Sequence, residues 1–155
     1  MQTNDQKFFH GNNGKAVLLI HGITSGAAQM VSMAKFLNDY RYSVWCVNLA
    51  GHGTFPQELL HTSCEDFIAK AEYDYKYLRK YFDTVYVGGL STGGCLSLYL
   101  AANYPEISGI IPISSPLRLR KGTFMTDEYP EDQIYFHRPM EGKERLFKQY
   151  HIHYE

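Results

Sequence analysis

The sequence has few cysteines, no long apolar run and no excess of charge of one sign. Its three cysteines, Cys46, Cys64 and Cys95, form no C-x-x-C pair, so neither a disulfide framework nor a zinc site is predicted. Each falls within a predicted strand or helix, which is typical of small buried side chains in a reducing compartment. The apolar runs are shorter than the ~20 residues of a membrane span, and residues 1–7 lack the apolar core of a signal peptide. We therefore expect a cytoplasmic protein without a membrane span.

Charge and composition exclude further classes. Fifteen basic residues stand against sixteen acidic ones, which leaves a net charge of -1 and no positive field that would gather phosphates. Nucleic acid is therefore not an expected partner. Hydrophobic residues make up 45% of the chain and charged residues 20%, which is typical of a globular domain and not of a disordered one. We find no internal repeat and no low-complexity tract.

Short apolar segments alternate with longer amphipathic ones from residue 15 to residue 116, which is typical of βαβ units. The fold class is therefore α/β, a three-layer α/β/α sandwich with a mainly parallel, doubly wound sheet. The order of strands across the sheet is predicted to be second, first, third, fourth. The predicted strands are 17–20, 44–47, 85–87 and 110–113, and the predicted helices are 27–38, 63–78 and 95–102.

Two helices carry additional signals. A capping box formed by Thr62 and Glu65 is predicted to begin the second helix. The third helix, 95–102, is apolar nearly all round and ends before Pro105, so we expect it to be the most buried. Residues 1–116 are thus predicted to form the core. Residues 117–155 change in character and are predicted to be a lid, a linker or an interrupted second half.

The central chemical signal is a G-x-S-x-G motif, Gly89-Leu90-Ser91-Thr92-Gly93, between a predicted strand and a predicted helix. That context is the one in which this motif forms a nucleophile elbow. A sharp, strained turn holds the serine hydroxyl clear of the backbone, and glycines remove Cβ atoms that would clash there. The structural alternative is a glycine-rich turn that happens to hold a serine. We interpret Ser91 as the catalytic nucleophile, with Gly89 and Gly93 in supporting positions.

A second signal, His21-Gly22-Ile23-Thr24, directly follows the first predicted strand. If the first and third strands are neighbours, this loop meets the elbow, and the backbone N–H groups of Ile23 and Thr92 converge on the carbonyl oxygen of a bound ester. These two groups are the predicted oxyanion hole, supported by Gly22. His21 is interpreted as a structural histidine that braces the loop by hydrogen bonds rather than as a proton-transfer group.

From Phe8 to Pro116 the chain resembles the α/β-hydrolase superfamily, and within it bacterial carboxylesterases similar to monoacylglycerol lipases. The resemblance implies the N-terminal half of that fold, esters of fatty or other simple carboxylic acids as substrates, no metal and no organic cofactor. Thioesters, peptides and other acyl compounds stay open. The stretches that carry the resemblance are Ala16–Thr24, Gly51-His52-Gly53-Thr54, Gly88–Gly94 and Ile113–Pro116.

Members of this superfamily continue, after the fourth of these strands, through a cap to strands that present the catalytic acid and then the histidine. The chain is therefore expected to be truncated before both groups. Residues 117–155 do contain the order acid, then histidine, but neither acid follows a buried strand, and His151 and His153 are read as a solvated tail. His10 and His61 are read as partly exposed polar residues. The candidates are Asp127, Asp132, His137, His151 and His153.

Two classes of function stay open. The first is a serine hydrolase whose missing groups come from further chain or from another chain, and the second is a non-catalytic hydrolase-fold fragment with a binding or assembly role. A sheet that ends at the fourth strand exposes the backbone and isoleucines of residues 110–113. We therefore expect either a homo-oligomer through this edge or a tail, 117–155, that folds back across it.

Overall fold

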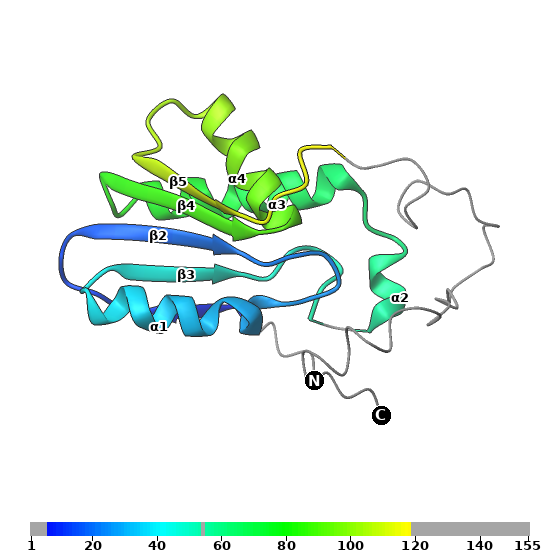
Figure 1. Ribbon diagram of the computed structural model, residues 1–155, viewed down its shortest axis with the longest axis horizontal. Coiled ribbons are helices and arrows are strands. Elements are labelled where there is room, and N and C mark those ends of the chain that lie inside the picture. The colour runs from blue at the N-terminus through cyan, green and yellow to red at the C-terminus, as the bar shows by residue number, and fades with distance from the viewer. Residues whose placement is uncertain (1–5, 54, 119–155) are drawn as a thin grey trace, which may run out of the picture. The chain divides into compact units, whose positions relative to one another are not determined.

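The sheet of the protein is mixed, with one antiparallel strand at its edge. The computed structural model describes residues 6–53 and 55–118. In this part of the chain the strands lie in the order β1-β3-β2-β4-β5 (Figure 1). β2, β3, β4 and β5 pair in parallel, and β1 pairs antiparallel with β3. The strands are β1 (Lys7–Phe9), β2 (Lys15–Ile20), β3 (Ser43–Val47), β4 (Thr84–Leu90) and β5 (Gly109–Ile113).

This topology confirms the predicted order of the four parallel strands. β1 could not be predicted from the sequence, because its three residues are too few to show an alternating pattern and two of them are exposed. At the other end of the sheet, β5 pairs with β4 and has no second partner among the described residues. Self-association through that edge stays a prediction, and a tail that covers it would involve residues outside the described part.

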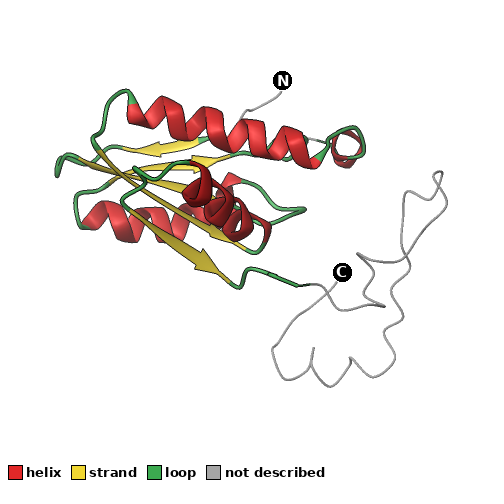
Figure 2. Ribbon diagram, turned by 90° about the horizontal axis from the view of Figure 1, so that it is seen from above, coloured by secondary structure: helices red, strands yellow, loops and turns green. Residues whose placement is uncertain are grey.

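Helices cover both faces of the sheet, which confirms the three-layer α/β/α arrangement (Figure 2). A 3₁₀ turn, η1 (Ala27–Met30), leads into α1 (Val31–Asp39) on one face. The helices α3 (Cys64–Arg79) and α4 (Thr92–Asn103) pack on the other. The short α2 (Pro56–Leu59) lies beyond the carboxyl ends of the strands (Figure 1).

The central strand β2 is buried on both faces, as expected for a parallel strand between two helical layers. Leu18 and Ile20 pack with Tyr75 of α3 and the apolar side chains of α4. Leu19, which points the opposite way because side chains alternate along a strand, packs with Ala34 of α1. Because β2 is the middle strand, its carboxyl end and the loop that follows lie in the middle of the sheet.

The start of α3 corrects two expectations. Ser63, not Thr62, is the N-cap: its hydroxyl accepts the N–H of Asp66, and the Asp66 carboxylate accepts the N–H of Ser63. The predicted capping box is wrong by one residue because the Thr62 hydroxyl instead donates to the carbonyl of Leu59, at the end of α2. The expectation of a buried Cys64 is also wrong, since this first helical residue is exposed. Cys46 is buried, and Cys95 is half-buried.

One acidic side chain, Asp74, lies on the buried face of α3. Both of its carboxylate oxygens are 2.8 Å from the Nζ atom of Lys70, one helical turn earlier. Burial raises the pKa of Asp74, and the Lys70 ammonium offsets only part of this effect. The folded state therefore favours the protonated carboxyl more than the unfolded chain does.

The variant Asp74→Asn is expected to change how stability depends on pH. Because the folded pKa of Asp74 lies above its unfolded value, the native state takes up a proton first as the pH falls. Its contribution to stability is fully present below the unfolded pKa and is lost as the pH rises through the folded pKa. The wild type should therefore gain free energy of unfolding relative to the variant on acidification, measured by chemical denaturation from neutral pH downward. A difference between the two proteins that does not vary with pH would contradict this assignment.

Candidate active site

Ser91 lies at the turn between β4 and α4, in a backbone conformation that is unfavourable for a residue with a side chain. Its φ is 54° and its ψ is -116°. The Ser91 N–H donates to the carbonyl oxygen of Ile113, 2.8 Å away in β5, and the Ser91 carbonyl accepts the N–H groups of Gly94 and Cys95. These bonds hold the strained turn in place. The expected strain at Ser91 is confirmed, and the residue is half-buried rather than enclosed.

The glycines around Ser91 are required by close approach of backbone segments. A Cβ atom at Gly93 would lie 2.1 Å from the carbonyl oxygen of Ile20, and one at Gly89 would lie 2.3 Å from the carbonyl carbon of Gly93. Neither distance leaves room for a methyl group. The motif therefore allows α4 to begin directly against the end of β2.

The loop after β2 meets this turn. β2 and β4 are neighbouring parallel strands with Ile20 opposite Gly89, so the two loops leave the same edge of the sheet. A Cβ atom at Gly22 would lie 3.5 Å from the Cβ of Ser91. The contact follows from the predicted order of the strands.

Most N–H groups of this loop are engaged. Gly22 donates to the side-chain oxygen of Gln29 at 2.9 Å, Thr24 donates to Nε2 of His52 at 3.2 Å, and Ser25 donates to the Gly22 carbonyl. Within residues 6–53 and 55–118, the N–H of Ile23 has no acceptor.

The first turn of α4 has the same property. The backbone N–H of Thr92 finds no acceptor in the described part of the chain, because the first N–H groups of a helix lack an intrahelical partner. The positive end of the helix dipole lies at the same place, which favours a negative charge nearby. The Ile23 N–H therefore lies in the loop after β2 and the Thr92 N–H in the first turn of α4, the two segments that meet at Ser91.

His21 is buried and braces the loop. Its Nδ1 donates to the carbonyl of Gly22 at 2.7 Å, and its Nε2 accepts the N–H of Leu49 at 3.1 Å. Burial lowers the pKa of His21, and the neighbouring His52 acts in the same direction, while the bond to Gly22 opposes them. The side chain therefore makes the contacts of a neutral structural histidine.

Two supporting residues were missed by sequence analysis. Gln29 occupies the Gly22 N–H, and the buried Asn48 accepts the N–H of Ala27 while donating to the carbonyl of His52 at 2.7 Å. Asn48 directly follows β3 and precedes the Gly51-His52-Gly53 stretch, and this position at a strand end is the signal that could have singled it out.

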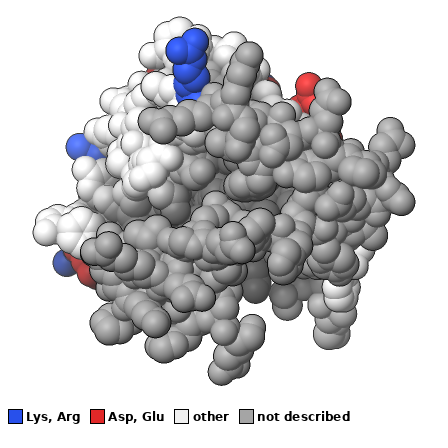
Figure 3. Space-filling view, turned by 45° about the vertical axis from the view of Figure 1, so that its right-hand side comes forward, with Lys and Arg blue, Asp and Glu red and all other residues white. Residues whose placement is uncertain are grey.

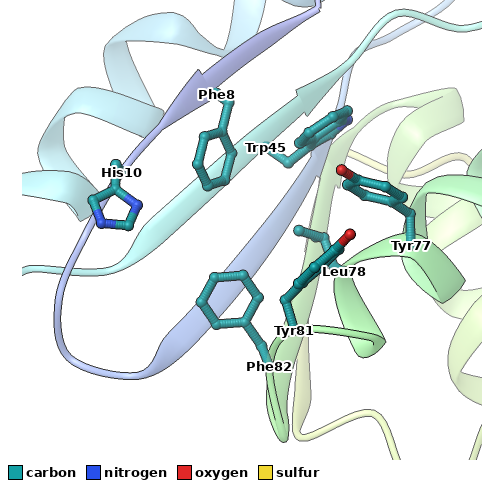
Figure 4. Close-up of a pocket in the computed structure, with 7 residues that line it drawn as sticks. All are labelled: Phe8, His10, Trp45, Tyr77, Leu78, Tyr81 and Phe82. Carbon is teal, nitrogen blue, oxygen red and sulfur yellow. The ribbon is translucent and has the colours of Figure 1, made fainter.

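Among the hollows that described residues line are three that do not include Ser91. The predicted pocket at its hydroxyl therefore stays a prediction. One, of about 160 Å³, lies beside the two loops and is bounded by Thr24, His52 and Phe55 among others. A second, of about 380 Å³, lies next to α1 and includes Tyr86 and Ile111. The third, of about 420 Å³, is an aromatic groove between β1, β3 and the end of α3 (Figure 4), lined by Phe8, His10, Trp45, Tyr77, Leu78, Tyr81 and Phe82.

The candidate acids and histidines of residues 117–155 all lie outside the described residues. Residues 6–53 and 55–118 contain no group of three His, Cys, Asp or Glu side chains that could hold a metal ion. None of the described helices is long and apolar enough to cross a membrane. On the face shown in Figure 3, the few visible Lys and Arg side chains stand apart from one another.

A mainly parallel sheet between two helical layers, with a strained serine after a central strand, defines an α/β-hydrolase fold. The chain belongs to the α/β-hydrolase family described as serine aminopeptidase, S33, which matches residues 11–135. This family consists of hydrolases. Proteins similar to this chain include enzymes named as a monoacylglycerol lipase and a carboxylesterase.

Two curated relatives and one solved structure illustrate the similarity. The thermostable monoacylglycerol lipase of Bacillus sp. (strain H-257) is 37% identical over 110 residues, which cover 71% of this chain and 44% of that protein. The carboxylesterase of Bacillus subtilis (strain 168) is 36% identical over 112 residues, or 72% of this chain and 45% of that protein. A structure of the metagenome-derived lipolytic enzymes LipS and LipT has a TM-score of 0.72 and 30% identity, covering 77% of this chain and 49% of that one. The chain thus spans slightly less than half the length of these relatives.

Proposed function

We propose that this chain carries the nucleophile half of a serine carboxylic-ester hydrolase. Ser91 attacks the ester carbonyl, the alcohol leaves, and water then hydrolyses the acyl-serine intermediate. The observation that carries the proposal is the strained Ser91, which stands where the loop after β2 meets the first turn of α4. Backbone hydrogen bonds with Ile113, Gly94 and Cys95 hold the strained turn in place. Strained backbone that is held by its surroundings is concentrated at active sites.

The N–H groups of Ile23 and Thr92 are the proposed oxyanion hole. The neighbouring loop N–H groups, those of Gly22, Thr24 and Ser25, already have acceptors, whereas these two have none within the described ranges. Donors that are fixed before the reaction stabilise the developing negative charge without reorganising. Ile23 is favoured over Gly22, Thr24 and Ser25 because its N–H, unlike theirs, has no acceptor among the described residues.

The catalytic base must come from another part of the protein or from another chain. Both ring nitrogens of His21 and of His52 are occupied by backbone groups, so neither can take the Ser91 proton without breaking its own loop. A serine without its base is a weak nucleophile. The acid and the histidine of the triad are therefore proposed to lie outside the described residues.

Esters of simple carboxylic acids are the proposed substrates, with no metal and no organic cofactor. This follows from the relatives named monoacylglycerol lipase and carboxylesterase, together with a site built for acyl transfer. The alternative, a fragment with a binding or assembly role, shares the fold but does not require the strained serine to react.

Labelling with a serine-directed fluorophosphonate tests the proposal. We expect a single adduct, mapped to Ser91 by peptide mass spectrometry, formed faster in the native protein than in the same chain unfolded in denaturant. The paired assay is hydrolysis of p-nitrophenyl butyrate, with a p-nitroanilide of the same acyl group to detect amide cleavage. Equal labelling of native and unfolded protein, or an adduct at another serine, would assign the chain to the non-catalytic alternative.

A further inference from the structure

Two buried histidines, His21 and His52, join two loops by a reciprocal pair of hydrogen bonds. His21, in the loop after β2, accepts the N–H of Leu49 in the loop after β3, at 3.1 Å from Nε2. His52, in the loop after β3, accepts the N–H of Thr24 in the loop after β2, at 3.2 Å from Nε2. Each histidine thus receives a backbone donor from the other loop, and the two rings lie 4.9 Å apart.

The remaining nitrogen of each ring ties it to its own loop. Nδ1 of His21 lies 2.7 Å from the carbonyl oxygen of Gly22, and Nδ1 of His52 lies 2.8 Å from that of Ala50. A carbonyl oxygen accepts only, so Nδ1 must carry the hydrogen, and a backbone N–H donates only, so Nε2 must not. Both imidazoles are therefore held as the neutral Nδ1–H tautomer.

The hydrogen bond that His52 accepts from the Thr24 N–H lies one residue from the proposed oxyanion donor, Ile23. Thr24 has a φ of 61°, which is uncommon for a β-branched residue and needs a partner to hold it. Its N–H is fixed by His52, and the N–H of Gly22 is fixed by Gln29. Ile23 lies between these two anchored positions, so the direction of its own N–H is set by them.

Packing around the second loop keeps His52 in place. Asn48 donates to the His52 carbonyl at 2.7 Å, and the ring of Phe67 stands edge-on to the imidazole at 5.3 Å between centroids. A Cβ atom at Gly53 would lie 2.4 Å from the Asn48 amide nitrogen, so this contact requires glycine. His52 is consequently buried, with 5% of its surface exposed.

We propose that His21 and His52 form a reciprocal latch in which His52, through Thr24, positions the Ile23 N–H for the oxyanion. His52 is thus a positioning residue that never touches the substrate. The effect of His52 on catalysis rests on the proposed function. The latch itself is a statement about tautomers and hydrogen bonds that can be measured separately.

Nitrogen-15 NMR of the imidazoles in the full chain tests the latch without any assay of activity. We expect His21 and His52 to be neutral with hydrogen on Nδ1, and the amide of Thr24 to exchange slowly with solvent. Hydrogen on Nε2 of His52 would overturn the latch, because that atom could then no longer accept the Thr24 N–H. The exposed His61 serves as the internal control.

Two matched variants test the positioning role. Gln at position 52 can bring a side-chain oxygen to the place of Nε2 and accept the Thr24 N–H, whereas Asn can replace only the Nδ1–H bond to Ala50. H52N should therefore lower kcat by about 10- to 100-fold with little change in KM, because a displaced oxyanion donor acts only in the transition state. H52Q should retain kcat within about threefold, because its side-chain oxygen can still accept the Thr24 N–H and keep the Ile23 N–H in position. H61N is the control for replacing a histidine as such.

The rates are counted per site titrated by the fluorophosphonate, so that loss of folded protein is separated from loss of positioning. H52N with the wild-type kcat, while hydrolysis still depends on Ser91, would overturn the positioning role. The rates are measured in a preparation that includes the acid and the histidine of the triad, on this chain or on its partner. Absence of Ser91-dependent hydrolysis there in every variant is instead the failure of the proposed function, and the catalytic role of the latch falls with it. If H52N does not fold, the tautomer of His52 in the wild type and the kcat of H52Q decide, and a large loss in H52Q would count against the latch.

Discussion

Ser91→Ala is expected to abolish ester hydrolysis and to leave the fold intact. The alanine keeps the Cβ atom and the turn, and its methyl group breaks no hydrogen bond among the described residues, because the Ser91 hydroxyl makes none with them. In a protein with a complete triad, loss of the nucleophile lowers kcat by a factor on the order of a million. Hydrolysis of p-nitrophenyl butyrate and fluorophosphonate labelling measure the loss, and circular dichroism with thermal unfolding measures the fold.

The matched control for this variant is Ser63→Ala. It also replaces a serine at a helix N-cap, but at α3, and its hydroxyl accepts the Asp66 N–H. It should lose about 1 kcal/mol of stability, the usual effect of deleting a capping hydroxyl, and keep full activity. The opposite pattern, with hydrolysis retained in Ser91→Ala, would place the chemistry at another residue and end the case for Ser91 as nucleophile.

Gly93→Ala is expected to be strongly destabilising, at or above the upper end of the about 1–3 kcal/mol that overpacking usually costs. The added methyl group would meet the carbonyl oxygens of Ile20 at 2.1 Å and His21 at 2.6 Å. Both are backbone atoms at the end of the buried β2, so they cannot move aside as a flexible side chain can. Relief requires that α4 shift away from β2, which also displaces Ser91. Urea denaturation measures the free energy of unfolding.

Gly109→Ala is the control for this second variant. Its Cβ atom would approach only the ring of Tyr86, at 3.2 Å, and the phenol side chain can rotate away. A loss within about 1 kcal/mol is expected for such a change. If Gly93→Ala were as mild as Gly109→Ala, the close packing of α4 against β2 would not be required by the fold.

The four parallel strands could be predicted from sequence because each is a short apolar run between polar or glycine-rich segments. Their order followed from the right-handed crossover and from the place of the motifs at the strand ends. Helix starts were less certain. The capping box was misplaced by one residue because Thr62, Ser63, Glu65 and Asp66 offer two overlapping pairs, and the bond of Thr62 to Leu59 decides between them.

The local pattern around Ser91, Gly89 and Gly93 determined by itself where the strained turn would be, because strain and glycine requirements arise within a few consecutive residues. The sequence also placed the His21 loop at the same edge of the sheet. Which N–H groups of that loop are engaged was decided only by the tertiary structure. The acceptors, Gln29 and His52, lie seven and twenty-eight residues from their donors, and no local pattern encodes a hydrogen bond between loops that meet only after the sheet has formed.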